Sequence, residues 1–451
     1  MAGNLFDTLQ ERGYLYQFTN KDTVRKMLNG ERITAYIGVD PTADSLHIGH
    51  CLPLVIGSYL QEAGHRVIVI LGGATALIGD PSSKNDMRKM VSSDFVNQNR
   101  PGIEKAIGKF LKLDGDNPAL ILNNADWYKG YDYIDFMRNI GVHFNVNKML
   151  ACDAYKNRIA NGGLTFFEMG YMLMQAYDFV YLNRKYGCTL EFGGSDQWGN
   201  IVAGVELGRK LNNISNEEDT TFQAFTNTLL LNADGTKMGK SEKGAVWVSA
   251  DKYSPLDFYQ YFYNRDDRDT EKMLKMLTKL PLDEISMIMQ GDIRDAKRRM
   301  AYEVTKLVHG EEKAKEAMET ATGMFNNNYD NAPEYHLIDT DNNIVDVLVN
   351  AKLVNTKSEG RRMIDSKAVT VDGEIVTDYQ LDITKLVESN GFAIILPSIF
   401  STLLSINSVK LPFSTLHTPL LTEPFSVRVL ATLYPIIPYS LEDSSTLLKY
   451  S

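Results

Sequence analysis

Short apolar runs and stretches of helical periodicity alternate along the first half of the chain. Residues 33–39 look like a strand, and residues 66–71 form a continuous β-branched run of the kind that is buried on both faces of a sheet. Between them, residues 50–61 carry apolar side chains at helical spacing. Strand, helix and strand predict a βαβ unit with a right-handed crossover, and hence a doubly wound parallel sheet that binds ligands at the C-terminal ends of its strands.

The same alternation continues to about residue 231. Further strand-like runs cover residues 119–122, 189–192 and 221–231, and a helical stretch covers residues 164–181. The pattern is that of an α/β protein, so residues 1–245 are predicted to form one Rossmann-like domain.

A helical, apolar segment at residues 127–163 interrupts the alternation and includes Phe136, Met137 and Ile140. Taken alone, such a segment fits a helix buried within one subunit as well as a surface between two copies of the chain. Both interpretations stay open at this point.

Past residue 245 helical periodicity dominates, which predicts a separate helical domain at residues 246–325. Ser254-Pro255 is a good N-cap and first-turn pair, and only Pro281 and Gly291 break the pattern briefly. Residues 326–342 begin with a polar, turn-rich run and are predicted to be a linker.

Residues 343–396 have the pattern of a small α+β module. Two short helices are expected at residues 344–350 and 358–365, followed by a hairpin at residues 368–376 with Asp372-Gly373 at its turn.

The last segment, residues 397–451, changes character again and is rich in Ser, Thr, Leu and Pro. Its prolines rule out long helices. They are six of the 14 in the chain, at Pro397, Pro412, Pro419, Pro424, Pro435 and Pro438. An altered reading frame, a lineage-specific extension and a disordered appendage all fit this composition, and the segment carries no recognisable chemistry.

Composition narrows the class of protein. With 451 residues the chain is too long for one hydrophobic core, and 44% hydrophobic and 23% charged residues are ordinary for a soluble protein. The three cysteines are widely spaced, which argues against disulfides or a zinc site and favours the cytoplasm. The sequence has neither a leader peptide nor the ~20 apolar residues of a membrane helix, so no membrane association is expected.

Candidate chemistry begins where the first strand ends. The run from Tyr36 to His50 passes through small and turn-forming residues and ends in His47-Ile48-Gly49-His50. Such a turn lets the backbone approach a ligand closely, and the following helix start can face an anion. The two imidazoles lie three residues apart, where they can donate to phosphate oxygens. Alone, the tetrapeptide also fits a partly buried helix start or an incidental metal pair.

A lysine loop lies far downstream, at Lys237-Met238-Gly239-Lys240-Ser241. On its own it fits a solvated charged turn. It follows an apolar segment and a turn at residues 228–235, however, so its lysines are predicted to lie on a movable connection near the sheet. Mobile cations that close over a departing pyrophosphate are what a nucleotidyl transfer needs.

The His-Ile-Gly-His and Lys-Met-Gly-Lys-Ser pair resembles the signature pair of class I aminoacyl-tRNA synthetases. Over most of residues 1 to about 395 the chain is similar to the bacterial-type tyrosyl-tRNA synthetase family. The resemblance implies L-tyrosine, ATP and the tRNA for tyrosine as substrates, Mg²⁺ entering with ATP without a dedicated protein site, and a homodimer with residues 127–163 at its interface. It also implies that residues 246–325 bind the tRNA anticodon region and that residues 343–396 bind RNA.

The resemblance also implies residue roles. Tyrosine is expected to contact Tyr36 and Asp178 through its phenol, Tyr171, Gln175 and Asp80 through its ammonium group, and Gln197. ATP is expected to contact Gly38, Asp40, Thr42, His47, Gly49, His50, Gly194, Asp196, Lys237 and Lys240. The groups expected to act in catalysis are His47, His50, Lys84, Arg88, Lys237, Lys240 and Ser241. Tyr171, Gln175 and Asp178 recur at helical spacing, so they can share one helix face.

One departure from the family pattern and two alternative interpretations remain. The family's RNA-binding module closes with a glycine and a basic, aromatic strand, but the sequence departs after residues 391–396, which leaves the completeness of the module open. A tryptophanyl-type synthetase would share both signatures, although it would not need Tyr36 and Asp178 as phenol partners. A catalytically silent RNA-binding protein on the same fold is the third reading, and the intact histidines and lysines argue against it.

Overall fold

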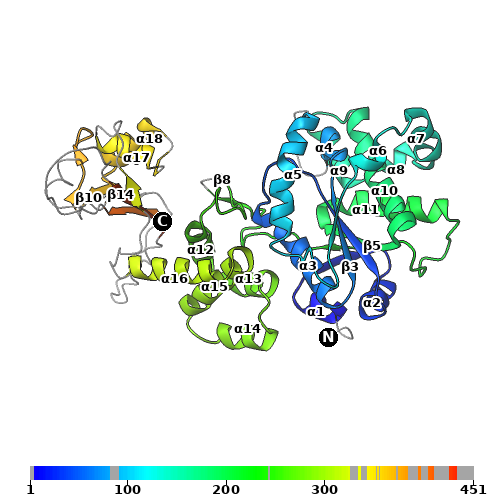
Figure 1. Cartoon of the computed structure of the whole chain (residues 1–451), viewed down its shortest axis with the longest axis horizontal. Helices are drawn as coiled ribbons and strands as arrows, with labels where there is room; N and C mark the ends of the chain where they lie inside the picture. The colour runs from blue at the N-terminus through cyan, green and yellow to red at the C-terminus, as the bar shows by residue number, and fades with distance from the viewer. Residues whose placement is uncertain are drawn as a thin grey trace, which may run out of the picture. The chain divides into compact units, whose positions relative to one another are not determined.

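The computed structural model describes residues 5–81, 91–241, 244–325, 334–336, 343–351, 353–354, 356–371, 374–383, 395–397, 405–410 and 426–433. The chain forms two compact units (Figure 1). One unit comprises Met1–Pro255 and Arg265–Lys313, and the other comprises Leu256–Asn264 and Ala314–Ser451. The finer division into the domains expected from the sequence stays a prediction.

The first unit is built on a six-stranded sheet with the order β1-β6-β5-β2-β3-β4. Its strands are β1 (Leu15–Phe18), β2 (Thr34–Val39), β3 (Arg66–Leu71), β4 (Leu120–Asn123), β5 (Cys188–Gly194) and β6 (Gln223–Asn227). All neighbours run parallel except β1, which pairs antiparallel with β6. The predicted doubly wound parallel sheet is confirmed, with an antiparallel edge strand that the hydrophobic pattern did not indicate.

Strand alternation gives each face of the sheet its own helices (Figure 1). Helix α3 (Cys51–Glu62) covers one face, where Gly57 packs close to Val67 and Phe192. Helices α10 (Phe166–Tyr186) and α11 (Trp198–Leu211) cover the opposite face. There Tyr36, Phe179 and other buried side chains form a continuous core. The expected helices at residues 50–61 and 164–181 are therefore present.

The sheet region contains further helices besides these three. They are α1 (Leu5–Glu11), α2 (Lys21–Asn29), α4 (Thr75–Ile78), α5 (Ser93–Ile107), α6 (Ala125–Tyr128), α7 (Tyr133–Asn139), α8 (Val146–Leu150) and α9 (Asp153–Ala160). Three of them, α7, α8 and α9, fall in residues 127–163, so this segment is helical as predicted.

Past the sheet the chain is helical, as its periodicity predicts. The helices are α12 (Pro255–Tyr263), α13 (Thr270–Leu277), α14 (Leu282–Met289), α15 (Ile293–His309) and α16 (Glu311–Phe325), with the short 3₁₀ turn η6 (Asp267–Asp269) before α13. Pro281 is the N-cap of α14, which explains the break in the pattern there.

The second unit contains the expected small module. Its elements are α17 (Ile344–Asn350), α18 (Lys357–Asp365), β10 (Val369–Val371) and β11 (Glu374–Ile375), packed around an aliphatic core of Val and Ile residues. Strands β10 and β11 pair as a hairpin, while the Asp372-Gly373 turn lies outside the described residues.

The sheet of this module continues into the segment after residue 396. Its order is β11-β10-β12-β13-β14-β9, with β9 (Glu334–His336), β12 (Ile395–Pro397), β13 (Ser405–Lys410) and β14 (Ser426–Leu433). The rest of residues 397–451 lies outside the described residues. Within the described part of the chain, no helix has the length and apolar character needed to span a bilayer.

Candidate active site

The order of strands creates a switch point between β2 and β5. From β2 the chain continues outward through β3 and β4, whereas β5 and β6 lie on the other side of β2. The connections after β2 and β5 therefore diverge, and in a doubly wound sheet the ligand-binding crevice is expected at the carboxyl ends of two such strands. The segment that ends in His50 follows β2, and the segment Ser195–Gln197 follows β5.

The two histidines form the first turn at this crevice. His47 is the N-cap of η2 (Ile48–His50), and its Nδ1 accepts a hydrogen bond of 3.1 Å from the Gly49 amide. A neutral His47 ring therefore carries its proton on Nε2 and can donate it to a ligand. The rings of His47 and His50 are tilted by 31° at a centroid distance of 3.9 Å, so the two imidazoles are in direct contact.

The lysine loop packs directly against this turn, although about 190 residues separate the two segments. A Cβ on Gly49 would lie 3.2 Å from the Met238 carbonyl oxygen, and one on Gly239 would lie 3.2 Å from His47 Nδ1. Gly239 has φ of +135°, a conformation that other residues rarely adopt. The close approach of the two segments thus depends on glycine on both sides.

Behind the loop, residues 246–248 hold the two segments together. The Ile48 amide donates to the Val246 carbonyl at 2.9 Å, and the Val246 amide donates to the Gly239 carbonyl at 3.0 Å. Trp247 lies edge-on to the His47 ring. The histidine turn and the lysine loop are therefore one structural assembly.

Lys237 reaches across the crevice to the turn after β5. Its Nζ lies 3.0 Å from Oδ2 of Asp196, and its side chain is 56% exposed. The ammonium group is therefore accessible to solvent and lies beside the segment that is expected to bind ribose. The side chains of Lys240 and Ser241, and all of Lys84 and Arg88, lie outside the described residues.

Asp40, directly after β2, links this assembly to α10. Its two carboxylate oxygens accept hydrogen bonds of 2.9 Å from Thr75 Oγ1 and from the Tyr171 hydroxyl. Nearby, Gly38 is exposed and no atom lies within 4 Å of where its Cβ would be. Thr42 is exposed at the same edge, where its amide donates to the Asp40 carbonyl.

A second polar group lies at the end of α4 and the start of α11. Asp80 is buried and accepts a hydrogen bond of 2.7 Å from Gln197 Nε2, while Gln197 Oε1 accepts from Asn200 at 3.0 Å. Gly194 precedes this turn, and a Cβ there would lie 2.7 Å from Asp196 Oδ1. Two residues expected to contact tyrosine are thus joined to each other.

On α10, Asp178 is the acceptor of several buried hydrogen bonds. Its carboxylate accepts from Trp127 Nε1 at 2.8 Å, from the Tyr128 hydroxyl at 3.0 Å and from Asn124 Nδ2 at 3.1 Å. Burial raises the pKa of Asp178 to about 7, and these three donors oppose that rise. Asp178 is only 4% exposed, so its carboxylate depends on these donors and not on solvent.

Comparisons with known proteins identify the family. The model of class I tRNA synthetases (W and Y) matches residues 28–326, and that of the tyrosine–tRNA ligase SYY-like C-terminal domain matches residues 325–396. The chain belongs to the class I tRNA synthetases of the W and Y group. The C-terminal match ends at residue 396, where the sequence departs from the pattern of the tyrosyl-tRNA synthetase family.

Individual relatives agree with this assignment. The chain is 46% identical over 402 residues to tyrosine–tRNA ligase of Clostridium tetani, covering 87% of this chain and 97% of the relative. It is 46% identical over 384 residues to that of Fusobacterium nucleatum, covering 84% and 93%. A C-terminally truncated mitochondrial tyrosyl-tRNA synthetase of Aspergillus nidulans has a TM-score of 0.64 at 30% identity, covering 71% of this chain and 94% of that structure.

The structure of this class I synthetase also contains a polar residue that sequence reasoning missed. Glu191 is the register partner of Tyr36 on the neighbouring strand and is 2% exposed. Its Oε1 accepts from Gln175 Nε2 at 3.1 Å, and its Oε2 has no hydrogen bond among the described residues. Burial raises the pKa of Glu191 to about 8, with the bond from Gln175 opposing the rise. A lone glutamate in an apolar strand gave no signal of this kind.

Tyr36 lies beside Glu191 in the same core. Its hydroxyl is fully buried and makes no hydrogen bond of normal geometry in the described part of the chain. Burial raises its pKa well above the ordinary value, and the nearby carboxylate of Glu191 adds to the effect. Tyr36, Gln175, Asp178 and Glu191 together are called the polar pocket below.

Helix α15 of this synthetase carries five lysines and arginines, which make it a candidate surface for phosphates: Arg294, Lys297, Arg298, Arg299 and Lys306. Four basic residues of α15 pair with acids, which weakens the case for a phosphate-binding face based on charge. The pairs are Lys297–Asp267 at 2.8 Å, Arg298–Asp295 at 2.6 Å, Arg299–Glu284 at 2.9 Å and Lys306–Glu311 at 3.2 Å.

Proposed function

We infer that the protein is a tyrosine–tRNA ligase: it activates L-tyrosine with ATP and transfers the tyrosyl group to the 3′ end of its tRNA. The observation that carries the inference is the polar pocket, a cluster of buried polar side chains within an apolar core. A buried hydroxyl and a buried carboxylate suit the phenol of tyrosine, whereas a ligand without the hydroxyl would leave both of these groups unpaired.

Tyrosine is proposed to enter with its phenol toward Tyr36 and Asp178. Its ammonium group would then lie toward Tyr171, Gln175 and Asp80. All three already hydrogen-bond neighbouring polar groups, Tyr171 with Asp40, Gln175 with Glu191 and Asp80 with Gln197, so their orientations are set before substrate arrives. Such preorganisation lowers the free-energy cost of ordering side chains on binding.

ATP is proposed to lie across the crevice. Gly38, which has open space above it, would face the nucleotide, with Asp40 and Thr42 at the same edge. Gly194 and Asp196 would face the ribose, while Gly49 and the histidine turn would border the nucleotide and its phosphates. The roles of Lys84, Arg88, Lys240 and Ser241 rest on the resemblance alone.

The chemistry of the first step then needs no general base. The carboxylate of tyrosine, with a pKa near ~3.5, is already ionised at neutral pH and attacks the α-phosphate of ATP in line. Pyrophosphate leaves, and His47, His50 and Lys237 stabilise the charge that develops on it. Mg²⁺ would enter as the counter-ion of the ATP phosphates and neutralise part of this charge. Among the described residues, no group of three His, Cys, Asp or Glu side chains is placed to hold a metal ion.

In the second step a ribose hydroxyl at the 3′ end of the tRNA attacks the mixed anhydride and releases AMP. We propose that the helical segment and residues 343–396 hold the tRNA at a distance from the active site. Because the cations of α15 are largely paired, shape and hydrogen bonding are expected to contribute more to this contact than net charge.

A homodimer is proposed as the working form. Seven large apolar side chains of residues 133–167 are between 46% and 70% exposed in the single chain, which is unusual for a monomer. They are Tyr133, Ile134, Val142, Val146, Ile159, Phe166 and Phe167.

A cytoplasmic location is proposed as well, and the three free cysteines are compatible with it.

Tyrosine-dependent exchange of pyrophosphate into ATP tests the proposal. We expect exchange with tyrosine and none above background with tryptophan. With phenylalanine the expected kcat/KM is about 10⁵-fold lower, a magnitude that was measured on tyrosyl-tRNA synthetase itself and is not an independent prediction. Exchange that depends on tryptophan, or binding of RNA without any exchange, would contradict the proposal.

A further inference from the structure

The lysine loop is continuous with a small hairpin whose own hydrogen bonds make it one unit. This hairpin, residues 230–238, is closed by the bond from the Met238 amide to the Leu230 carbonyl at 2.8 Å and by an isolated bridge between Leu231 and Lys237. At its tip, Asp234 Oδ1 accepts from both the amide and the hydroxyl of Thr236 at 2.9 and 2.6 Å. Residues 233–237 are nevertheless exposed, so the hairpin depends on outside contacts for its position.

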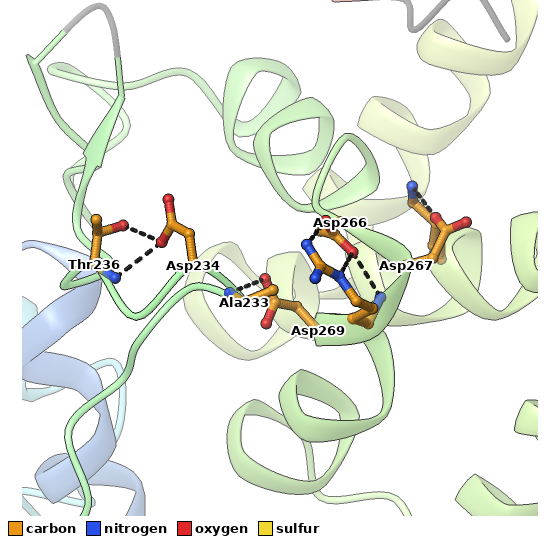
Figure 2. A network of polar contacts seen from close by, with 8 residues as sticks. Ala233, Asp234, Thr236, Asp266, Asp267 and Asp269 are labelled. Carbon is orange, nitrogen blue, oxygen red and sulfur yellow. Dashed lines mark hydrogen bonds and ion pairs between the residues drawn. The ribbon is translucent and has the colours of Figure 1, made fainter. Parts of the chain in front are cut away.

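Two of those contacts come from one short stretch of the helical segment. The Ala233 amide donates to Asp269 Oδ2 at 3.0 Å (Figure 2), and Lys272 Nζ donates to the Leu231 carbonyl at 3.0 Å. Asp269 is only 4% exposed and stands at the N-cap of α13, yet its side chain makes no capping bond to that helix. Its carboxylate is used for the hairpin instead.

Helix α13 is firmly attached to the rest of the first unit. Its inner face, including Met273, Leu274 and Leu277, is fully buried. Arg12 donates to the carbonyls of Lys275 and Thr278 at 2.8 and 3.1 Å beyond this face. Asp269 and Lys272 are therefore held on a fixed support, and the hairpin is the part with fewer constraints.

The preceding turn, η6, is connected to α15 as well. Lys297 Nζ lies 2.8 Å from Asp267 Oδ1, and Asp266 accepts hydrogen bonds from the amide and guanidinium of Arg268. Figure 2 labels the two acceptors, Asp266 and Asp267. These bonds fix the backbone that carries Asp269. Contacts to α15 and within the turn thus support the segment from which Asp269 and Lys272 reach the hairpin.

We propose that Asp269 and Lys272 are positioning residues for adenylation, which hold the hairpin so that Lys237 reaches the crevice beside Asp196. The proposal rests on the function proposed above. It assigns the two residues no contact with substrate. Both act through the hairpin backbone, at Ala233 and Leu231, on the side chain that faces the departing pyrophosphate.

The expected effect follows from the role of orientation. A misplaced transition-state donor loses part of its stabilisation, and losing one outright costs about 10²–10³ in rate. Removing one anchor leaves the other in place, so the adenylation rate is expected to fall by roughly 5- to 30-fold. The tyrosine Kd is expected to stay within about twofold, because the polar pocket does not touch the hairpin.

Single-turnover formation of tyrosyl-adenylate, followed by stopped-flow fluorescence on the full chain, measures both quantities. Lys272→Met removes the donor and keeps the aliphatic stem. Lys275→Met is the matched control, since Lys275 lies on the same helix and pairs with Glu271 at 2.6 Å without touching the hairpin. Asp269→Ala and Asp269→Asn form a second pair, in which Asn keeps an acceptor oxygen on the same stem.

A slower rate in Lys272→Met and Asp269→Ala, with Lys275→Met unchanged and Asp269→Asn closer to wild type, supports the proposal. Equal rates in Lys272→Met and Lys275→Met overturn it, whatever the folding of the Asp269 variants. If the wild-type protein forms no adenylate with tyrosine, the proposed function fails instead. The anchor is then tested by hydrogen exchange at residues 231–237, which must accelerate in Lys272→Met and not in Lys275→Met.

Discussion

The polar pocket and the hairpin at residues 230–238 differ in nearly every physical respect, although one reaction is proposed to use both. Every member of the polar pocket lies on a central strand or on α10, and Tyr36, Asp178 and Glu191 are almost completely buried. Lys237 projects from an exposed hairpin and is more than half exposed. The first region is buried and hydrogen-bonded before substrate arrives, whereas the second is exposed to solvent.

The difference reflects what each region must distinguish. Recognition of a phenol requires desolvated partners, because an exposed carboxylate would bind water as readily as tyrosine. Stabilisation of a leaving group requires a cation that improves its contact only as charge develops, which favours an exposed, adjustable side chain. We therefore expect changes in the polar pocket to alter binding of tyrosine, and changes in the hairpin to alter the rate.

The largest effect is expected from Asp178→Ala. The substitution removes the acceptor of three buried donors and the proposed partner of the phenol, and each buried donor left unsatisfied costs about 1–3 kcal/mol. We expect the tyrosine Kd, measured by equilibrium dialysis, to rise by at least about 10²-fold. Phe95→Ala, at an exposed site on α5, is a control variant whose tyrosine Kd should not change. An unchanged tyrosine Kd in Asp178→Ala would contradict the proposed contact between Asp178 and the phenol.

Lys237→Ala is expected to follow, with an effect on rate alone. Loss of one transition-state donor predicts an adenylation rate about 10²-fold lower, and the tyrosine Kd should stay within about twofold. Lys252→Ala removes another cation near the histidine turn, paired with Asp44 at 2.7 Å, and serves as a control with a smaller effect. Equal losses in the two variants would mean that the effect is electrostatic in general and not specific to Lys237.

Glu191→Leu is expected to raise the KM for tyrosine by roughly tenfold. Gln175 would lose its acceptor and its fixed orientation, and an unsatisfied buried amide costs about 1–3 kcal/mol. Glu191→Gln keeps an acceptor oxygen and should remain near wild type. Gln223→Leu, a buried polar residue on the adjacent strand β6, should lower stability without changing the KM for tyrosine.

The smallest expected effect is on pH dependence. The ionised form of Asp178 is the better acceptor of a hydrogen bond from the phenol, and its pKa of about 7 predicts that tyrosine binding weakens by about fivefold between pH 7 and pH 6. The Glu191→Gln background removes the other carboxyl that titrates in this range. A tyrosine Kd that is independent of pH from 6 to 8 in that background would contradict the raised pKa of Asp178.

The same shift has a defined sign for stability. The pKa of Asp178 rises from an ordinary value of 3.8 to about 7 on folding, so the folded state binds the extra proton between these values. The contribution of Asp178 to the free energy of unfolding is therefore greatest below about pH 4 and is lost as the pH rises through 7.

Much of this fold could be predicted because its central strands are buried on both faces. The run at residues 66–71 coincides with β3, and the helix expected at residues 50–61 coincides with α3 to within a residue. Strand β1 escaped prediction because it is a short edge strand whose Tyr16 is exposed, so it lacks both a continuous apolar run and a clean alternation.

The site divides in a similar way. The histidine turn and the lysine loop could be found from the sequence because each is a contiguous motif. Glu191 and the partners of Asp178 could not, because their proximity depends on strand register and on the packing of α10 against the sheet. Tyr36 and Glu191 are 155 residues apart in the chain and become neighbours only through the pairing of β2 with β5.

A single stopped-flow titration tests the central claim most directly. Tyrosine is titrated at saturating ATP against wild type, Asp178→Ala and Lys237→Ala, and each curve yields a tyrosine Kd and an adenylation rate. The account predicts a weakened Kd chiefly in Asp178→Ala and a reduced rate with normal Kd in Lys237→Ala. A variant of Lys237 in which Kd weakens as much as the rate falls would contradict the separation of tyrosine recognition from transition-state stabilisation.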